Sequence, residues 1–356
     1  TVKSSYTIIG LMSGTSMDGL DIAFSKYEQT TNNKWQLTVY QTETDIYPKN
    51  MLENLKNSTC FSASQLLDLD KKLGHYFAEK VNAFILRNKI DKKSIDAIAS
   101  HGHTIFHQPD KGYTYQIGCG STLAFNTELK VINDFRQKDV IAGGQGAPLV
   151  PIGDKLLFHQ ESSCFLNLGG FANCCILKNK NVIAYDICPA NLPLNQIMNR
   201  LGLEYDKDGK NAREGKVDLI ALEKLNALSF YQQNSPKSLG TEWLTAEFNP
   251  VITEIINNKD KLRTIIEHIA IQIGENLIDS QSIYITGGGV RNTFLLERIA
   301  FHFEGEIVIP SEQIVDYKEA IIFGFLGALH LSGIPNTLAS VTGANKDVIG
   351  GVLHRP

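Results

Sequence analysis

The chain has 356 residues, of which 43% are hydrophobic, and its formal net charge is -4 at pH 7. That length is ample for a buried core and favours two lobes over one. Lys and Arg form no basic block, which excludes a nucleic-acid-binding surface, and no apolar run is long enough to span a bilayer. No signal peptide is evident and the six cysteines show no CxxC spacing, so we expect buried, reduced thiols in a cytoplasmic protein.

The first third of the chain alternates predicted strands and helices. Residues 6–26 predict a hairpin, in which two apolar runs flank a glycine-rich tip. Residues 62–89 predict a long amphipathic helix, because large apolar residues recur there at steps of three and four. Further strands are predicted over residues 35–47, 95–103 and 130–135.

The middle of the chain indicates a lobe boundary. Residues 142–151 read AGGQGAPLVP, a glycine- and proline-rich segment, and we therefore expect an N-terminal lobe over residues 1–142 and a C-terminal lobe over residues 143–356. Residues 163–191 repeat the opening plan of strand, glycine turn and strand, which predicts a structural duplication.

The second lobe continues the alternation of strands and helices. Residues 282–303 read as strand, three glycines and helix. Helices are predicted over residues 192–201, 217–228, 262–279 and 317–333. This alternation along the whole chain predicts the α/β class.

Three glycine clusters follow predicted strands, and each could hold phosphate groups against its backbone. Residues 14–19 have the glycine spacing of a P-loop, but Leu-Asp at residues 20–21 replaces the Lys and hydroxyl of that motif. Residues 287–289 begin like a dinucleotide fingerprint, but Asn292 stands where its last glycine belongs. The sequence thus disfavours a Walker NTPase and a Rossmann dehydrogenase.

A nucleotide held between two lobes accounts for all three clusters. Backbone N–H groups and two hydroxyls at residues 14–16 can bind phosphate oxygens. The carboxylate of Asp18 would repel a bare phosphate, so it suits a site with a divalent metal between the two, most simply Mg²⁺. Residues 169–170 would face the same cleft, and residues 287–289 would let the rest of the nucleotide lie against backbone. Taken singly, each cluster also fits an ordinary turn.

The chain resembles the anhydro-N-acetylmuramic acid kinases over residues 9–351. The resemblance rests on the strings IGLMSGTSMDGLDIA, SHGHTIFH, NDFRQKDVIAGGQGAPLVP, NLGGFAN, YDICPAN, YDKDGKNAREG, PKSLG, ITGGGVRN, KEAIIFGFLGAL and VTGANKDVIGG. It implies the actin-like, hexokinase-like and Hsp70-like ATPase fold, with two RNase H-like lobes around an ATP cleft. It also implies that the 1,6-anhydro ring of a cell-wall sugar is opened and O6 phosphorylated, giving N-acetylmuramic acid 6-phosphate in peptidoglycan recycling.

The resemblance also implies roles for individual residues. The implied nucleotide-binding residues are Gly14, Thr15, Ser16, Met17, Asp18, Gly19, Leu20, Asp21, Gly169, Gly170, Gly287, Gly288, Gly289 and Asn292, with Asp18 also at the metal. The implied sugar-binding residues are His101, Asp134, Arg136, Asn191 and Glu319. Asp186 is the implied general base, which activates the water that attacks the anomeric carbon.

Asp186 also stands out from its neighbours in the sequence. It ends an apolar run and precedes Pro189, which suits a loop at a strand end. Its apolar neighbours would remove water from the carboxylate and raise its basicity. A carboxylate that only caps a turn is the alternative.

Other candidates have alternative, purely structural explanations. Arg136 could bind the lactyl carboxylate of a muramic acid, or pair with Asp134 within its loop. Glu319 could contact the sugar, or simply suit the first turn of a helix. Asn191 could bind sugar or cap a helix. His101 and the nearby histidines offer no convincing third ligand, so a metal there is disfavoured, and hydrogen bonds to sugar hydroxyls or to the loop are expected instead.

Several positions depart from the family pattern. Residues 187–191 read Ile-Cys-Pro-Ala-Asn where Thr-Gly-Pro-Gly-Asn is usual, and His103 replaces a usual glutamine. The loss of two glycines beside Asp186 could reshape the pocket, because Ala and Cys tolerate fewer backbone angles.

Two further functions stay open at this level: an ordinary hydroxyl kinase of the same fold, and a non-catalytic sugar or nucleotide sensor. The expected ligands are ATP, Mg²⁺ and a small amino sugar, with no nucleic acid and no membrane as partner. A homodimer is compatible with the resemblance.

Overall fold

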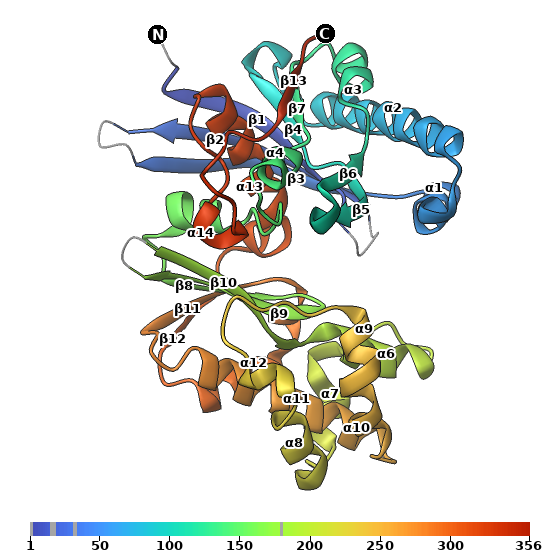
Figure 1. Ribbon diagram of the computed structural model, residues 1–356, viewed down its shortest axis with the longest axis vertical. Helices are drawn as coiled ribbons and strands as arrows, with labels where there is room; N and C mark the ends of the chain where they lie inside the picture. The colour runs from blue at the N-terminus through green and yellow to red at the C-terminus, as the bar shows by residue number, and fades with distance from the viewer. Residues whose placement is uncertain (1–2, 15–18, 31–33, 179–180) are drawn as a thin grey trace. The chain divides into compact units, whose positions relative to one another are not determined.

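The computed structural model describes residues 3–14, 19–30, 34–178 and 181–356. The chain divides into two compact units: unit 1 comprises Thr1–Phe158 and Tyr317–Pro356, and unit 2 comprises His159–Asp316 (Figure 1). This division differs from the one expected from the glycine- and proline-rich segment. The chain leaves unit 1 sixteen residues later than residue 142, and the C-terminal segment returns to unit 1.

Unit 1 is built on a sheet that has six strands within the described residues, in the order β13-β7-β4-β1-β2-β3. These strands are β1 (Ser5–Met12), β2 (Gly19–Gln29), β3 (Trp35–Ile46), β4 (Ala97–Ser100), β7 (Val131–Asn133) and β13 (Val352–His354). β1 pairs antiparallel with β2 and parallel with β4. The predicted opening hairpin is thereby confirmed.

Helices and a small hairpin complete unit 1. They are α1 (Lys49–Asn57), α2 (Ala63–Arg87), α3 (Gly120–Thr127), α4 (Gln137–Ile141), α5 (Pro151–Gly153), α13 (Glu312–Leu331), α14 (Ala339–Thr342), β5 (His103–Gln108) and β6 (Tyr113–Ile117). α2 confirms the predicted long helix. Ser62 accepts a hydrogen bond from the backbone of Gln65 and the Gln65 side chain accepts one in return, so a capping box fixes the start of α2.

Unit 2 repeats the sheet plan of unit 1. Its five strands within the described residues have the order β10-β9-β8-β11-β12. They are β8 (Cys164–Leu168), β9 (Phe171–Lys178), β10 (Asn181–Pro189), β11 (Ser282–Thr286) and β12 (Glu306–Val308). In both sheets the first strand in the chain pairs antiparallel with the second and parallel with the fourth, which is the RNase H-like arrangement. The predicted α/β class and duplication are confirmed.

Helices cover one face of the second sheet (Figure 1). The main ones are α6 (Asn191–Arg200), α7 (Lys210–Glu214), α8 (Leu219–Asn226), α9 (Thr241–Trp243), α10 (Asn249–Thr253), α11 (Asn258–Asn276) and α12 (Thr293–His302). α11 is central: Leu262, Ile266 and Ile273 are fully buried in the core of unit 2. Cys164, Cys174, Cys175 and Cys188 are buried in unit 2 as free thiols, whereas Cys60, also a free thiol, is exposed, contrary to the expectation of burial.

The returning segment is tied into unit 1 by α13. Gly10 of β1 lies directly against this helix, because a Cβ added to Gly10 would meet the carbonyl oxygen of Ala320 at 1.9 Å. Lys318 forms an ion pair with Asp154, with 2.6 Å between Nζ and Oδ1, and both side chains are buried. Asp154 begins the π-helix η4 (Asp154–Phe158), so the ion pair joins the end of the first segment of unit 1 to the start of its second.

Candidate functional site

The first glycine cluster lies at the tip of the β1–β2 hairpin. Of its predicted nucleotide residues, Gly14, Gly19, Leu20 and Asp21 are described, whereas Thr15, Ser16, Met17 and Asp18 lie outside the described residues. Leu20 is fully buried in the core of unit 1, so only its backbone is available to a ligand. Asp21 accepts a hydrogen bond from Thr44 Oγ1 at 2.6 Å.

A buried chain of hydrogen bonds precedes this cluster in unit 1. Tyr47 donates to Ser13 Oγ at 2.6 Å, and Ser13 Oγ lies 2.9 Å from Nδ1 of His103. The Ser13 hydroxyl therefore bonds Tyr47 and His103 at the same time. All three side chains are buried, and burial lowers the pKa of His103. This network fixes Ser13, the residue that precedes the glycine turn, and could not be predicted from the sequence.

Arg136 and His101 form a joined pair in unit 1. The imidazole Nε2 of His101 accepts from both Nε (3.1 Å) and Nη2 (3.0 Å) of Arg136, and Nη1 donates to the carbonyl oxygen of Gly146 (2.9 Å). Burial and the charge of Arg136 lower the pKa of His101 to about 3, so its ring is neutral at physiological pH. Burial lowers the pKa of Arg136 to about 10, so the guanidinium keeps its charge.

The other two predicted sugar residues of unit 1 are placed differently. Asp134 follows β7 with a φ of 58°, a left-handed conformation that non-glycine residues rarely adopt and that clusters at functional sites. Within the parts of the chain described here, it forms no ion pair with Arg136, so the internal contact considered from the sequence is not made. Glu319 lies in α13 with an exposed side chain.

Asp186 occupies a β-bulge near the end of β10, where the register against β9 shifts. Its backbone N–H donates to the carbonyl of Lys237 at 3.0 Å, and its Oδ2 accepts from the N–H of Leu239 at 2.7 Å. The carboxylate is half-buried. Burial raises the pKa of Asp186, and the hydrogen bond from Leu239 opposes that rise. The string PKSLG, known from the sequence only as a family motif, therefore holds the carboxylate in place.

The two glycine clusters of unit 2 meet at one place. Asn191 links them: its backbone N–H donates to the carbonyl of Gly169, and its side-chain Nδ2 donates to Leu168 at 2.9 Å. The same side chain borders the second cluster, since a Cβ on Gly289 would lie 3.2 Å from its Oδ1. The structure thus brings together Gly169, Gly170, Asn191, Gly287, Gly288 and Gly289. Asn191 borders the predicted nucleotide residues of unit 2.

Asn292 serves the helix that follows the glycine turn. Its Oδ1 accepts from the N–H of Leu295 at 3.0 Å, which caps α12. Gly209 lies directly against this cap, because a Cβ added to it would meet Asn292 Oδ1 at 2.5 Å, and its φ is 65°. The loop before α7 therefore supports the turn, which the string YDKDGKNAREG alone did not indicate.

Within the described ranges, no group of three or more His, Cys, Asp and Glu side chains could hold a metal ion. His107 bonds Thr114 Oγ1 at 2.9 Å. The predicted metal residue Asp18 lies outside those ranges, so the Mg²⁺ site stays a prediction. In the same part of the chain, no helix has the length and apolar character that crossing a membrane requires.

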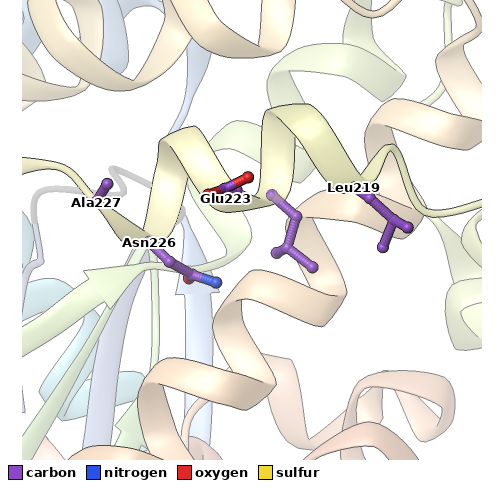
Figure 2. A pocket seen from close by; sticks show the side chains of 5 residues that line it. Leu219, Glu223, Asn226 and Ala227 are labelled. Atoms are coloured by element: carbon purple, nitrogen blue, oxygen red, sulfur yellow. The ribbon is translucent and has the colours of Figure 1, made fainter.

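An open hollow lies beside α8 in unit 2, lined by Leu219, Leu222, Glu223, Asn226 and Ala227 (Figure 2). Its polar end is already occupied, because Asn226 Oδ1 bonds His268 at 2.6 Å and Gln272 at 3.1 Å. One carboxylate, Glu223, is the charged group in the lining. None of these residues was predicted to be functional, and the set offers no pair of groups for acid–base chemistry.

Comparison with known proteins gives one consistent result. The family model described as anhydro-N-acetylmuramic acid kinase matches residues 6–356. The chain is 35% identical to the anhydro-N-acetylmuramic acid kinase of Shewanella loihica (strain ATCC BAA-1088 / PV-4), over 98% of this chain and 99% of that protein. It is 33% identical to the protein of that name from Vibrio vulnificus (strain CMCP6), over 97% of each chain.

Proposed function

Because this chain belongs to the anhydro-N-acetylmuramic acid kinase family, we propose that it opens the 1,6-anhydro ring of anhydro-N-acetylmuramic acid and phosphorylates O6. The product is N-acetylmuramic acid 6-phosphate, in peptidoglycan recycling. The observation that carries this proposal is the bulged carboxylate of Asp186, held by the backbone of residues 237–239.

Asp186 is proposed as the general base. Its Oδ2 is committed to Leu239, while no hydrogen bond to Oδ1 comes from the described residues, so Oδ1 is left to accept a proton from water. The activated water attacks C1 of the sugar, and the bond from C1 to O6 breaks. O6 bonds to the γ-phosphorus of ATP, while the bond from that phosphorus to the bridging oxygen of the diphosphate breaks and ADP leaves. The carboxylate takes the water proton. The raised pKa makes Asp186 a stronger base than an exposed aspartate.

Arg136 is proposed to bind the lactyl carboxylate of the sugar. No carboxylate of the described chain lies within 4.0 Å of its guanidinium, so this half-buried cation makes its hydrogen bonds to neutral acceptors, and the charge of Glu319 acts on it only from farther away. Such a charge favours an anionic ligand. Asp134 and Glu319 are proposed to accept from sugar hydroxyls, since a carboxylate is an acceptor with several free lone pairs.

ATP is the proposed phosphoryl donor. The glycines of unit 2 fit it: a Cβ on Gly170 would meet no atom closer than 3.6 Å, and one on Gly288 none closer than 4.0 Å, so the protein does not crowd the backbone there. The proposed contacts are Gly169, Gly170, Gly287, Gly288, Gly289 and Asn292, and in the first hairpin Gly14, Thr15, Ser16, Met17, Asp18, Gly19, Leu20 and Asp21. When bound, ATP supplies the γ-phosphoryl group, and we propose that Asp18 holds its Mg²⁺.

The remaining proposals concern the cellular location, the oligomeric state and the roles of the two units. We propose that the protein works in the cytoplasm as a homodimer, on a small amino sugar. We also keep the proposal that unit 1 carries the first phosphate hairpin and unit 2 the catalytic aspartate.

The test supplies ATP with either the anhydro sugar or reducing N-acetylmuramic acid, and follows ADP and the sugar phosphate by chromatography and mass spectrometry. We expect turnover of the anhydro sugar to N-acetylmuramic acid 6-phosphate. Turnover of the reducing sugar alone would replace the proposal with an ordinary hydroxyl kinase. ATP binding without turnover of either sugar would indicate a sensor.

A further inference from the structure

The sequence leaves open whether His101 bonds a sugar hydroxyl or its own loop, and in the structure both of its ring nitrogens are used by the protein. Nδ1 lies 2.8 Å from the carbonyl oxygen of Gly102, which can only accept, so Nδ1 carries the hydrogen. Nε2 is then a bare acceptor in the neutral ring, and it faces two N–H groups of Arg136. The side chain is 6% exposed. No ring nitrogen is left for a sugar hydroxyl.

Phe323 and Gly146 hold the side chains of His101 and Arg136 in place from two sides. The ring of Phe323 packs edge-on against His101, with 4.7 Å between centroids, and it also lies 5.8 Å from the guanidinium carbon of Arg136. On the other side, Gly146 offers its carbonyl to Arg136 while its own N–H donates to the fully buried Asp139 at 2.8 Å. Arg136 is therefore held at three of its five N–H groups.

The nature of these acceptors decides what charge the guanidinium presents. A carboxylate in place of the imidazole would form an ion pair and cancel the positive charge. A neutral imidazole and a carbonyl fix the orientation and leave the charge intact. One N–H on each of Nη1 and Nη2 is not used by the described residues, and the two together can bind both oxygens of a carboxylate.

We propose that His101 is a positioning residue, which orients Arg136 without forming an ion pair with it and thereby gives the enzyme its preference for a carboxylate-bearing anhydro sugar. This inference rests on the proposed function, in particular on Arg136 binding the lactyl group. It changes the expected role of His101 from direct sugar contact to action through Arg136.

The test compares two amide variants that differ by one methylene group. In His101→Gln the side-chain oxygen reaches the place of Nε2 and can still accept from Arg136. In His101→Asn the amide reaches only the place of Nδ1, so the contact with Gly102 is kept and that with Arg136 is lost. Each variant, with Arg136→Met beside it, is assayed for kcat/KM on 1,6-anhydro-N-acetylmuramic acid and on 1,6-anhydro-N-acetylglucosamine, which lacks the lactyl group.

The readout is the ratio of the two kcat/KM values. We expect Arg136→Met to lower the ratio by about 100-fold and His101→Asn by about tenfold, because hydrogen bonds to charged groups contribute about 1.5–3 kcal/mol. We expect His101→Gln to stay within about threefold of the parent ratio. Melting temperatures of all three identify misfolding, and binding of the acidic sugar to the double variant Asp186→Asn/His101→Asn by calorimetry gives the affinity without turnover.

The outcomes distinguish failure of the inference about His101 from failure of the proposed function. If Arg136→Met lowers the ratio and His101→Asn does not, the inference is overturned and the role of Arg136 stands. If both kcat/KM values fall in parallel in His101→Asn, the residue is merely structural. An unchanged ratio in Arg136→Met would remove the lactyl assignment, and the inference with it. A His101→Gln ratio as low as that of His101→Asn would also count against the role of the acceptor at Nε2.

Discussion

The two units share one sheet plan, yet they use the end of the same strand differently. In unit 1 the fourth strand of the plan, β4, is followed by His101, whose side chain holds Arg136. In unit 2 the equivalent strand, β11, is followed by Gly287–Gly289, where a turn brings backbone forward instead. One framework therefore supports a site made of side chains and a site made of main chain.

The difference follows from what each proposed ligand demands. A sugar with one carboxylate needs a directed charge at one point, which a guanidinium supplies. A nucleotide needs many weak contacts along its phosphates, which backbone N–H groups supply when no Cβ stands in the way. A side-chain site is therefore damaged by removing atoms, and a backbone site by adding them.

The largest expected effect is at Asp186, the proposed general base in unit 2. We expect Asp186→Asn to lower kcat by about 10²–10⁴-fold, because the amide cannot take a proton from water. The amide still accepts from Leu239, so ATP binding measured by calorimetry should persist. Equal kcat in variant and parent would remove Asp186 from the mechanism.

Adding a methyl group at Gly287 or at Gly288 should distinguish an effect on stability from an effect on ATP binding. Gly287 has a φ of 90° and a Cβ there would meet Asn167 Oδ1 at 2.6 Å, so Gly287→Ala should lower Tm by about 2–8 °C. Gly288 is the matched control, because its Cβ would enter open space. Gly288→Ala should keep the parent Tm and raise the KM for ATP by roughly tenfold, from overlap with the ligand.

Thermal melts and ATP kinetics on the two variants check this contrast. A Gly288→Ala variant with both the parent Tm and the parent KM for ATP would show that the turn does not face the nucleotide.

The smallest expected effect is on the pH profile. Asp186 must be ionised to act as base, so kcat/KM should fall as pH falls through its raised pKa. Leu239→Pro removes the N–H that opposes this rise, so the acid limb should move to higher pH, whereas Leu239→Ala keeps the N–H and the parent limb. If the acid limbs of the parent, Leu239→Pro and Leu239→Ala coincide, a group other than Asp186 determines the pH profile of kcat/KM.

The raised pKa of Asp186 also makes the stability of the fold depend on pH. Because the folded pKa of Asp186 is raised, its favourable contribution to folding is complete below the unfolded pKa, about 3.9, and is lost as pH rises through the folded pKa. Asp186→Asn should therefore melt higher than the parent at pH 7, and this gain should disappear in acid.

The sequence could predict features that depend on local pattern. The opening hairpin, α2 and the strand–glycine–helix unit at β11 follow from apolar periodicity and turn residues, and all are present. The predicted family and the kinase class are confirmed by the family match and the named relatives. Asp186 could be singled out because it ends an apolar run.

Contacts between distant residues could not be predicted in this way. His101 and Arg136 are 35 residues apart, and Asp186 and Leu239 are 53 apart, so their pairing depends on how β4 and β10 are placed in their sheets. The return of the C-terminal segment to unit 1 could not be predicted either, because α13 (Glu312–Leu331) runs without a break across residue 317, where unit 1 resumes.

That return sets an order of events during synthesis. Unit 2 is encoded without interruption, so all of it is synthesised before the partners of Gly10 and Asp154, which are Ala320 and Lys318. At 5–20 residues per second, roughly 8 to 32 seconds separate the synthesis of the two halves of unit 1. During that interval a nascent chain carries an unfinished first unit with β1 uncovered, and the last tenth of the polypeptide closes it.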